Sequence, residues 1–287
     1  MLKTQRNDAC WCGSGLKYKK CHLEKADLLL AYARRGYVVP PRGLIKSPEA
    51  IQGIKRSAVI TRGILDEMTR LIQPGVTTRE LDDWAMAYTL QNGGIPAPLG
   101  YRGFPKGICT SINQVLCHGI PDETKLKSGD IINIDVTTIL DGYYSDASRM
   151  YTVGAVSPDA QRLVDCTKEA LAIGVQAVTP YQPFNVIGEK IEAYATAQGY
   201  SVSKTFGGHG IGLAFHEEPF VCHFKMNEPG MIMVPGMVFT IEPILNQGDE
   251  ACDILQDGWT AVTVDGGLSA QWEHTVVITE TGVAVIV

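Results

Sequence analysis

The chain has 287 residues, of which 45% are hydrophobic and 20% charged, and its formal net charge is −6. This composition is typical of a soluble globular protein with one large domain or two ordinary ones, and no apolar run is long enough to span a membrane. No secretory leader precedes the eight cysteines, so we expect a cytoplasmic protein whose cysteines are thiols or metal ligands rather than disulfides.

Charge is distributed unevenly along the chain. Residues 1–46 hold ten Lys and Arg against three Asp and Glu, a net charge of +7, and the remainder carries −13. A basic segment on an acidic body predicts a polyanionic partner for that segment. A solvated linker that happens to be basic is the alternative.

Four potential metal ligands lie close together in the segment NDACWCGSGLKYKKCH, which spans residues 7–22. Three thiols and one imidazole are the donor set of a closed structural zinc site, and the Gly-Ser-Gly turn at 13–15 can bring the ligands together. Their spacing departs from the usual two residues between paired ligands, so spacing alone leaves zinc binding undecided. The four residues are Cys10, Cys12, Cys21 and His22.

Helices and strands then follow in an order that repeats. A short helix is predicted at 23–34, a linker around Gly36 and Pro40-Pro41, and a long helix from Pro48 to about residue 72. The order helix, helix, strand, strand recurs in both parts of the remaining chain and hints at two related halves. Its further elements are a helix capped by Thr77 or Thr78, strands at 131–140 and 143–153, helices at 158–178 and 183–198, and strands at 237–245, 259–264 and 272–287.

The hairpin at 131–153 places two carboxylates on one face. Asp141-Gly142 is a two-residue turn signal, so Asp135 should pair with Ser148, two residues along from Asp146. Side chains alternate with a period of two, and the two aspartates therefore become diagonal neighbours. A cation between them would offset their repulsion. Two solvated aspartates on an exposed sheet face are the alternative, although apolar residues flank Asp135.

Three further ligand-type residues lie in apolar or glycine-rich stretches. His209 lies in GGHGIG, Glu242 in VFTIEPI and Glu273 in QWEHTVVI, where alternation points His274 the other way. Each residue alone could be structural. Four carboxylates in such surroundings cannot compensate one another, but two divalent cations can. Oxygen donors with one nitrogen suit Mn, Fe or Co, so the set predicts a two-metal hydrolase.

Six segments resemble, in the same order, motifs of the bacterial type I methionine aminopeptidases, and this likeness covers about residues 45–287. They are SINQVLCHGIP, NIDVT, YSDASR, GGHGIGLAFHEEP, FTIEP and QWEHT. The resemblance implies an α+β pita-bread fold of two pseudo-symmetric halves, with the catalytic domain at 47–287. It also implies that two divalent ions are bound by Asp135, Asp146, His209, Glu242 and Glu273.

The same resemblance implies removal of the initiator methionine from nascent proteins with small second residues, by a metal-bridged water. Glu242 would carry the proton, while His118 and His216 would contact the peptide during catalysis. A monovalent cation near Asn113, Val115 and Ser269 is also implied. The substrate pocket would consist of Tyr101, Phe104, Cys109, His118, Phe215, His216 and Trp259.

At the N-terminus, CWCGSGLKYKKCH resembles the SEC-C zinc motif found at the end of the SecA protein and on some bacterial methionine aminopeptidases. This implies one structural zinc ion in residues 1–24, followed by a basic linker with a short helix at 25–46. A unit this small has no core, so the metal would supply its folding energy. We expect this unit to dock on the ribosome through Lys17, Lys19 and Lys20. We also expect a monomer with no membrane partner.

Two other functions fit parts of the sequence. A proline aminopeptidase or related dipeptidase shares the fold, but such enzymes usually carry a large N-terminal domain. A catalytically silent protein that binds ribosomes or RNA through its basic segment is the second alternative, and the complete set of five ligands argues against it.

Overall fold

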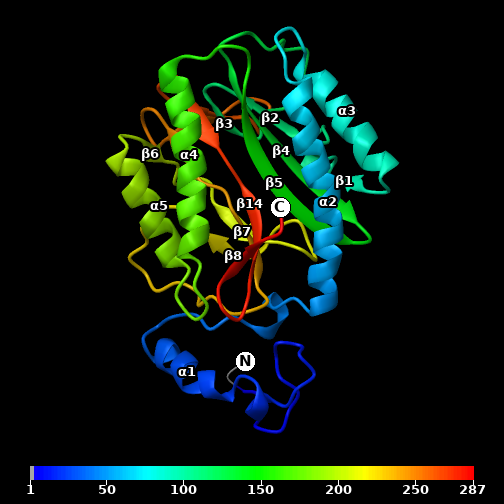
Figure 1. The fold of residues 1–287 in the computed structure, drawn as a ribbon. Helices are drawn as coiled ribbons and strands as arrows, with labels where there is room; N and C mark the ends of the chain where they lie inside the picture. The colour runs from blue at the N-terminus through cyan, green and yellow to red at the C-terminus, as the bar shows by residue number, and fades with distance from the viewer. Residues whose placement is uncertain (1–2) are drawn as a thin grey trace.

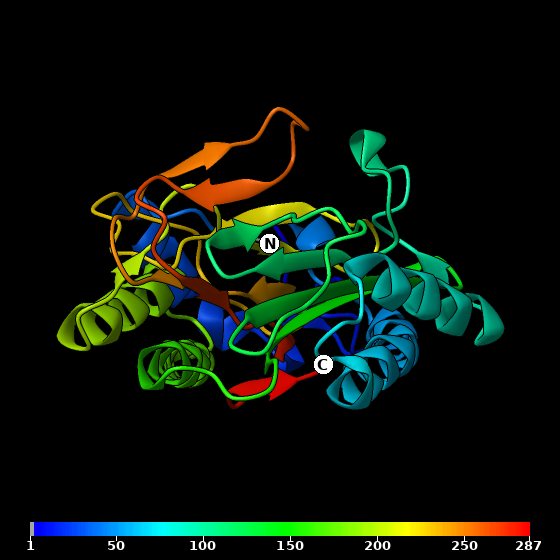
Figure 2. The ribbon, with the colours of Figure 1, turned by 90° about the horizontal axis from the view of Figure 1, so that it is seen from above.

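The computed structural model describes residues 3–287 and shows two halves flanked by helix pairs (Figure 1, Figure 2). Helices α2 (Pro48–Leu71) and α3 (Thr78–Gln91) lie on one side of the strands. Helices α4 (Pro158–Ala177) and α5 (Asn185–Ala197) lie on the other. The predicted repetition of a helix pair followed by strands is therefore confirmed.

Within the described residues, the named strands form four sheets and pair antiparallel throughout. One sheet contains β1 (Ile95–Pro96), β2 (Cys109–Ile112), β4 (Ile131–Leu140) and β5 (Tyr143–Thr152). A five-stranded sheet contains β7 (Gly208–Gly210), β8 (Glu217–Val221), β9 (Val238–Ile241), β14 (His274–Ile278) and β15 (Val283–Val285). One smaller sheet contains β6 (Ser201–Val202), β10 (Ile244–Asn246) and β13 (Ser269–Gln271). The other contains β3 (Val115–Cys117), β11 (Cys252–Ile254) and β12 (Ala261–Thr263).

The predicted helix starts are confirmed by their caps. Ser47 accepts a hydrogen bond from the Ala50 N–H at the start of α2. Thr77 and Glu80 form a reciprocal capping box at the start of α3. Both arrangements satisfy backbone donors that a helix N-terminus otherwise leaves without a partner.

Two strand predictions need correction. The stretch 272–287 is not one strand but a hairpin, because the chain turns back after Ile278 and β15 pairs with β14. The stretch 237–245 is divided between two sheets, since Pro243 lacks the N–H that would continue the pairing of β9. Most two- and three-residue strands are too short to show an alternating pattern and were not predicted.

The N-terminal unit packs onto the end of the body (Figure 1). Trp11, Tyr18 and Leu29 are buried in the same apolar cluster as Tyr181 and Val234 of the second half. The unit therefore shares a core with the body. Its helical elements, and those of the connecting segments, are η1 (Tyr18–Lys20), η2 (Leu23–Lys25), α1 (Ala26–Arg34), η3 (Arg42–Leu44) and η4 (Tyr101–Gly103).

The segment predicted as a linker packs along the body of the protein. Val38 forms a β-bridge to Met231, and Ile45 forms one to Met237. Lys46 is buried and forms an ion pair with Glu217, so one of the ten basic residues of the N-terminal segment is not available to a partner. Across residues 3–287, no helix has the length and apolar character needed to cross a membrane.

Candidate active site and metal centres

A cavity of about 270 Å³ lies between the two halves, and all five predicted ligands line it. Asp135 and Asp146 come from the β4–β5 hairpin, and His209 lies on β7. Glu242 directly follows β9, and Glu273 directly precedes β14. Residues more than a hundred positions apart in the chain thus converge on one space.

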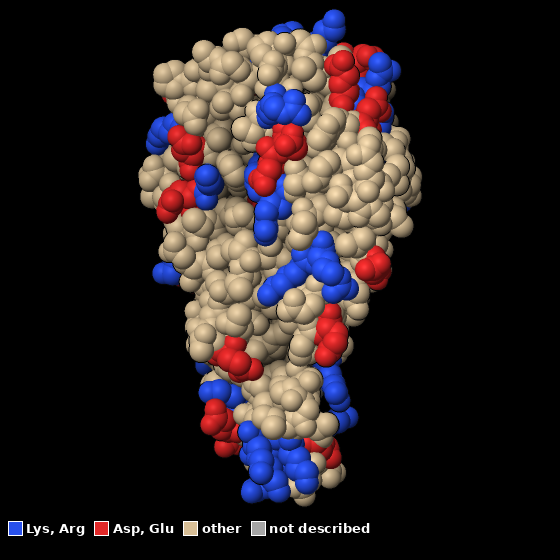
Figure 3. Space-filling view, turned by 45° about the vertical axis from the view of Figure 1, so that its right-hand side comes forward, with Lys and Arg blue, Asp and Glu red and all other residues tan. Residues whose placement is uncertain are grey.

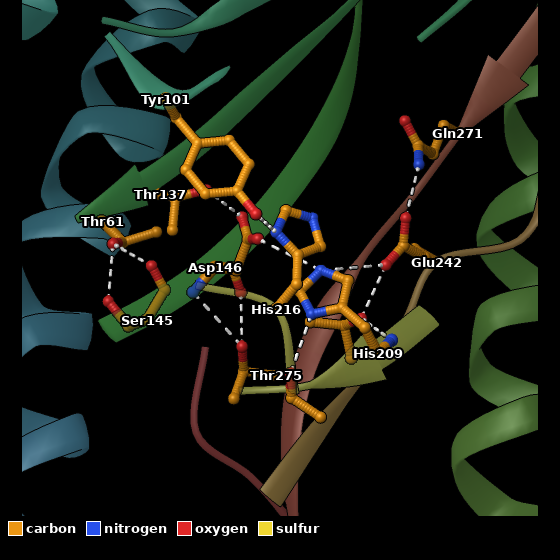
Figure 4. A network of polar contacts seen from close by, with 12 residues as sticks. Thr61, Tyr101, Thr137, Ser145, Asp146, His209, His216, Glu242, Gln271 and Thr275 are labelled. Atoms are coloured by element: carbon orange, nitrogen blue, oxygen red, sulfur yellow. Dashed lines mark hydrogen bonds and ion pairs between the residues drawn. The ribbon is translucent and has the colours of Figure 1, made fainter. Parts of the chain in front are cut away.

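The hairpin has the predicted register. Asp135 pairs with Ser148, and Thr137 pairs with Asp146. The Thr137 hydroxyl donates to Asp146 Oδ1 at 2.8 Å, which leaves Oδ2 facing His209 (Figure 4). The predicted diagonal placement of the two aspartates is therefore confirmed.

His209 presents a lone pair to the carboxylates. Its Nδ1 is 3.0 Å from the Gly210 carbonyl oxygen, and a carbonyl can only accept, so Nδ1 carries the proton. Burial lowers the pKa of His209 to about 4, which keeps the ring neutral near pH 7. Its Nε2 lies 3.8 Å from Asp146 Oδ2 and 3.8 Å from Glu242 Oε1. A lone pair facing two acceptors at this distance fits a cation between them.

Glu242 is held by three polar contacts. Its Oε1 accepts from the Thr240 hydroxyl at 2.6 Å, and its Oε2 accepts from Gln271 Nε2 at 3.2 Å (Figure 4). Its backbone N–H donates to Nε2 of the buried His223 at 3.1 Å. These contacts fix the carboxylate at the wall of the cavity.

Burial disfavours the charged form of the four carboxylates. It raises the pKa of Asp135 to about 6 and that of Glu242 to about 8. It also raises the pKa values of Asp146 and Glu273 well above their usual range, helped by repulsion from the neighbouring carboxylates. Within residues 3–287 none of the four forms an ion pair with Lys or Arg. Oxygen donors with one neutral imidazole fit divalent cations.

Ligand atoms of Asp146, His209 and Glu273 lie within 4.8 Å of one another. This spacing matches donors around a common ion. Asp135 lines the same cavity next to Asp146. The neighbouring His274 instead lines another groove, between α4 and β14, as strand alternation predicts.

The two predicted catalytic histidines border the same cavity. His216 Nδ1 lies 3.0 Å from the Tyr101 hydroxyl, and its ring lies 4.2 Å from that of His209 (Figure 4). His118 has a positive φ of 57° and contacts Trp259 edge-on. Burial lowers the pKa of both histidines, to about 3 for His216, so both rings are neutral near pH 7.

The predicted methionine pocket is also brought together. Phe104 and Trp259 meet edge-to-face at 5.2 Å, and Tyr101 and Phe215 lie 4.7 Å apart. Cys109 pairs with Asp135 across β2 and β4, and both line the cavity together with the aromatic residues. The aromatic residues therefore line the same cavity as the predicted metal ligands.

Several residues at the site were not predicted. Thr137 was recoverable, because the register that pairs Asp135 with Ser148 also pairs Thr137 with Asp146. Gln271 and His223 reach Glu242 through tertiary contacts that no local pattern signals. Arg102, Phe206 and Phe220 also line the cavity.

The four predicted zinc ligands form a second cluster. Ligand atoms of Cys10, Cys12, Cys21 and His22 all lie within 4.8 Å of one another. His22 Nδ1 is 3.2 Å from Cys10 Sγ and 3.1 Å from Cys21 Sγ, while Nε2 faces Glu280 at 3.3 Å. Burial raises the pKa of the Cys10 thiol to about 12, so a cation is needed to hold it as a thiolate. The donor set fits zinc, with a carboxylate orienting the histidine.

Comparisons with known proteins point to the same assignment. The profile of metallopeptidase family M24 matches residues 52–280, and that of the SEC-C motif matches residues 6–24. Methionine aminopeptidase A of Synechocystis sp. is 48% identical over 241 residues, 84% of this chain and 95% of the relative. A methionine aminopeptidase of Chlamydia pneumoniae is 44% identical over 286 residues, 98% of both chains.

A solved structure shows the same fold. The crystal structure of methionine aminopeptidase from Rickettsia prowazekii has a TM-score of 0.83 and 42% identity, and the match covers 84% of this chain and 98% of that one. The part of this chain that the Rickettsia structure does not cover is about as long as the N-terminal segment. The Chlamydia relative aligns with nearly the whole chain. The expected α+β pita-bread fold is confirmed.

Proposed function

The chain belongs to the methionine aminopeptidases of metallopeptidase family M24 and carries a SEC-C motif, and we propose that the cavity between its halves is the active site. The enzyme hydrolytically removes N-terminal methionine. The observation that carries the residue assignment is the convergence of four buried carboxylates and a neutral histidine on one cavity, with no ion pair to Lys or Arg within residues 3–287. We assign Asp135, Asp146, His209, Glu242 and Glu273 as the ligands of two divalent ions.

Fe, Mn or Co in the divalent state suits these donors. When bound, such ions polarise the scissile carbonyl and lower the pKa of a water molecule. The protein contributes a fixed ligand geometry. Thr137, Thr240 and Gln271 orient the carboxylates through hydrogen bonds, and His209 keeps its Nε2 lone pair exposed because Nδ1 donates to Gly210.

Glu242 is assigned as the group that moves the proton. Its carboxylate lies at the cavity wall, where it can accept a proton from the attacking water and pass it to the leaving amine. The contacts from Thr240 and Gln271 hold its two oxygens in place for both transfers.

His118 and His216 are assigned to the peptide. Both are neutral, so each ring carries one N–H and one lone pair. Nδ1 of His216 lies against the Tyr101 hydroxyl, which leaves Nε2 for the substrate. His216 is oriented by Tyr101, and we assign it to stabilise the oxygen of the scissile carbonyl as negative charge develops. His118 hydrogen-bonds the backbone next to the scissile bond.

The aromatic chamber selects methionine. Aromatic edges and faces with the Cys109 thiol form an apolar, polarisable lining, which suits a thioether side chain. We propose that small second residues are favoured because the same cavity must also admit the following residue. The chamber is lined by Tyr101, Phe104, Cys109, Phe215 and Trp259.

Comparing two peptides tests the activity. Protein loaded with Fe or Mn without oxygen should release methionine from Met-Ala-Ser and leave an Xaa-Pro peptide intact. Preferential cleavage of the Xaa-Pro peptide would instead indicate a prolidase-type enzyme. No turnover of either peptide by the loaded protein would favour the silent binding protein.

At the N-terminus we propose one structural zinc ion held by Cys10, Cys12, Cys21 and His22, in a unit spanning 1–24. The segment 25–46 connects this unit to the catalytic unit at 47–287. Support comes from the convergence of the four ligands and from the SEC-C match.

We further propose that the basic surface of the zinc unit docks on the ribosome. Lys17, Lys19 and Lys20 are exposed, and Lys and Arg side chains gather at this end of the molecule (Figure 3). Reversing all three charges to Glu should weaken co-sedimentation with ribosomes, and wild-type binding should fall steeply with salt. Unchanged binding would refute the proposal. The control is Lys55→Glu, an exposed lysine on α2, whereas a deletion of 1–46 would also remove the buried Lys46.

A further inference from the structure

We propose that Lys46 is a positioning residue for the active site and acts through Glu217 on the loop that carries Phe215 and His216. The inference rests on the proposed role of His216. Lys46 lies two residues before α2, and the sequence shows it only as one of the basic residues of the N-terminal segment. Its side chain is nevertheless among the least exposed of the charged residues, at 1%, and its partner's side chain is 15% exposed.

A buried lysine requires compensation, and here a single group supplies it. Lys46 Nζ donates to Glu217 Oε2. In the part of the chain that the structure describes, no other carboxylate pairs with Lys46. Because taking an ammonium group out of water is costly, this pair strongly restricts where the Glu217 carboxylate can lie.

The other oxygen of Glu217 organises the loop. Oε1 accepts from the Leu213 N–H at 2.8 Å and from the Ala214 N–H at 3.0 Å. One carboxylate thus ties two backbone donors of the turn to the lysine. The turn is closed at its start by Gly212, whose N–H donates to the Ala214 carbonyl at 3.3 Å.

This turn sets the position of the two site residues that follow it. Phe215 and His216 lie between the bonded amides and Glu217, the first residue of β8. Their rings stack on each other at 4.4 Å, and both contact Tyr101. A shift of the Glu217 carboxylate would therefore move His216 relative to the cavity.

Lys46 is itself anchored from both directions. Its backbone N–H donates to the Gly236 carbonyl at 2.8 Å, and the next residue, Ser47, caps α2. Its aliphatic stem passes beside Gly212, where an added Cβ would lie 3.3 Å from Lys46 Cε. The ammonium group is thus held by the body of the protein and serves as a fixed point for the loop.

The direct test measures the loop and the reaction separately. In Lys46→Met, amide exchange at Leu213 and Ala214 should accelerate at least about tenfold. The value of kcat for Met-Ala-Ser should fall by about 10- to 100-fold, because small displacements of a positioned group cost this much, while KM changes less. Lys55→Met, which removes an exposed lysine from the same region, should change neither quantity.

A double-mutant cycle separates positioning from general destabilisation. If Lys46 acts through His216, Lys46→Met should cost less than about threefold in kcat when introduced into His216→Ala. An equal loss in both backgrounds would overturn the inference, as would unchanged amide exchange at Leu213 and Ala214.

Stability and function remain distinguishable. Thermal unfolding identifies whether Lys46→Met is folded at the assay temperature, and Lys46→Met/Glu217→Gln, which leaves no unpaired buried charge, provides a second variant if it is not. Faster loop exchange in a protein whose wild type does not cleave Met-Ala-Ser would support the positioning contact and refute the proposed activity.

Discussion

The two ligand clusters of this chain differ in donor chemistry, in location and in what a metal would do for each. The cavity cluster has oxygen donors with one nitrogen, contributed by both halves of a body with its own core. The N-terminal cluster has three sulfur donors and one nitrogen within thirteen residues, in a unit with few apolar residues of its own. The body has an apolar core that does not depend on its metals, whereas we expect the N-terminal unit to need its zinc for stability.

The two clusters also differ in how open they are. The proposed active-site ligands border an open cavity, which is the arrangement expected of a catalytic site. The N-terminal cluster offers four protein donors, with Cys10 and His22 buried, as in a closed structural site. We therefore expect that each metal centre can be removed while the other is retained, and the following variants test that separation.

The largest effect is expected for Glu242→Gln. This change keeps the shape of the side chain but removes the carboxylate to which we assign metal binding and proton transfer, so kcat for Met-Ala-Ser should fall by about 1,000-fold or more. The thermal unfolding temperature should change little, and the zinc content should stay the same. Wild-type turnover by this variant would refute the role of Glu242.

Removing one sulfur ligand should empty the N-terminal centre. Cys10→Ser should lose its zinc and expose residues 3–34 to limited proteolysis, because Trp11 and Tyr18 are then no longer held in the shared core. Its kcat/KM should stay within about threefold of wild type, since the clusters are separate. A large loss of activity with intact metals in the cavity would show that the two regions are coupled.

A smaller effect is expected for the carboxylate that faces the zinc ligand. Glu280→Gln replaces the charged acceptor for His22 Nε2 by a neutral amide oxygen, and zinc affinity should fall by about 10- to 100-fold in a competition with a chelator. Glu24→Gln, which changes an exposed carboxylate that pairs with Lys25, is the matched control. Equal zinc affinity in both variants would mean that the Glu280 contact contributes nothing.

The smallest effect is expected for Thr137→Val. It removes the hydroxyl that orients Asp146 without changing the shape of the side chain, so affinity for the divalent ions should fall by about tenfold or less. Isothermal titration calorimetry of the metal-free protein with Mn measures this affinity. A loss as large as that of a missing ligand would imply that Thr137 contacts a metal directly.

The site was predictable where local rules determine geometry. The Asp141-Gly142 turn and the period of two sufficed to place Asp135 beside Asp146, and the register of the hairpin agrees. Motif resemblance supplied the other ligands, and all five line the cavity. Helix starts were predictable from Ser47 and Thr77, because capping is decided within one turn.

Contacts between distant segments could not be predicted in this way. Lys46 and Glu217 are separated by 171 positions, and a lysine among basic neighbours gives no sign that it will be buried. Similarly, Glu280 meets His22 only because the N-terminal unit packs beside the β14–β15 hairpin, which was itself expected to be one strand. The sequence patterns determine local geometry, whereas these pairs depend on how the parts assemble.

Metal stoichiometry tests most directly whether the protein has two separate metal centres. Native mass spectrometry should compare wild type, Cys10→Ser and Asp146→Ala after loading with zinc and Mn. We predict one zinc and two further ions in wild type, loss of the zinc alone in Cys10→Ser, and loss of the pair alone in Asp146→Ala. If either substitution emptied both centres, or if wild type bound only one metal in total, the assignment of two independent centres would be wrong.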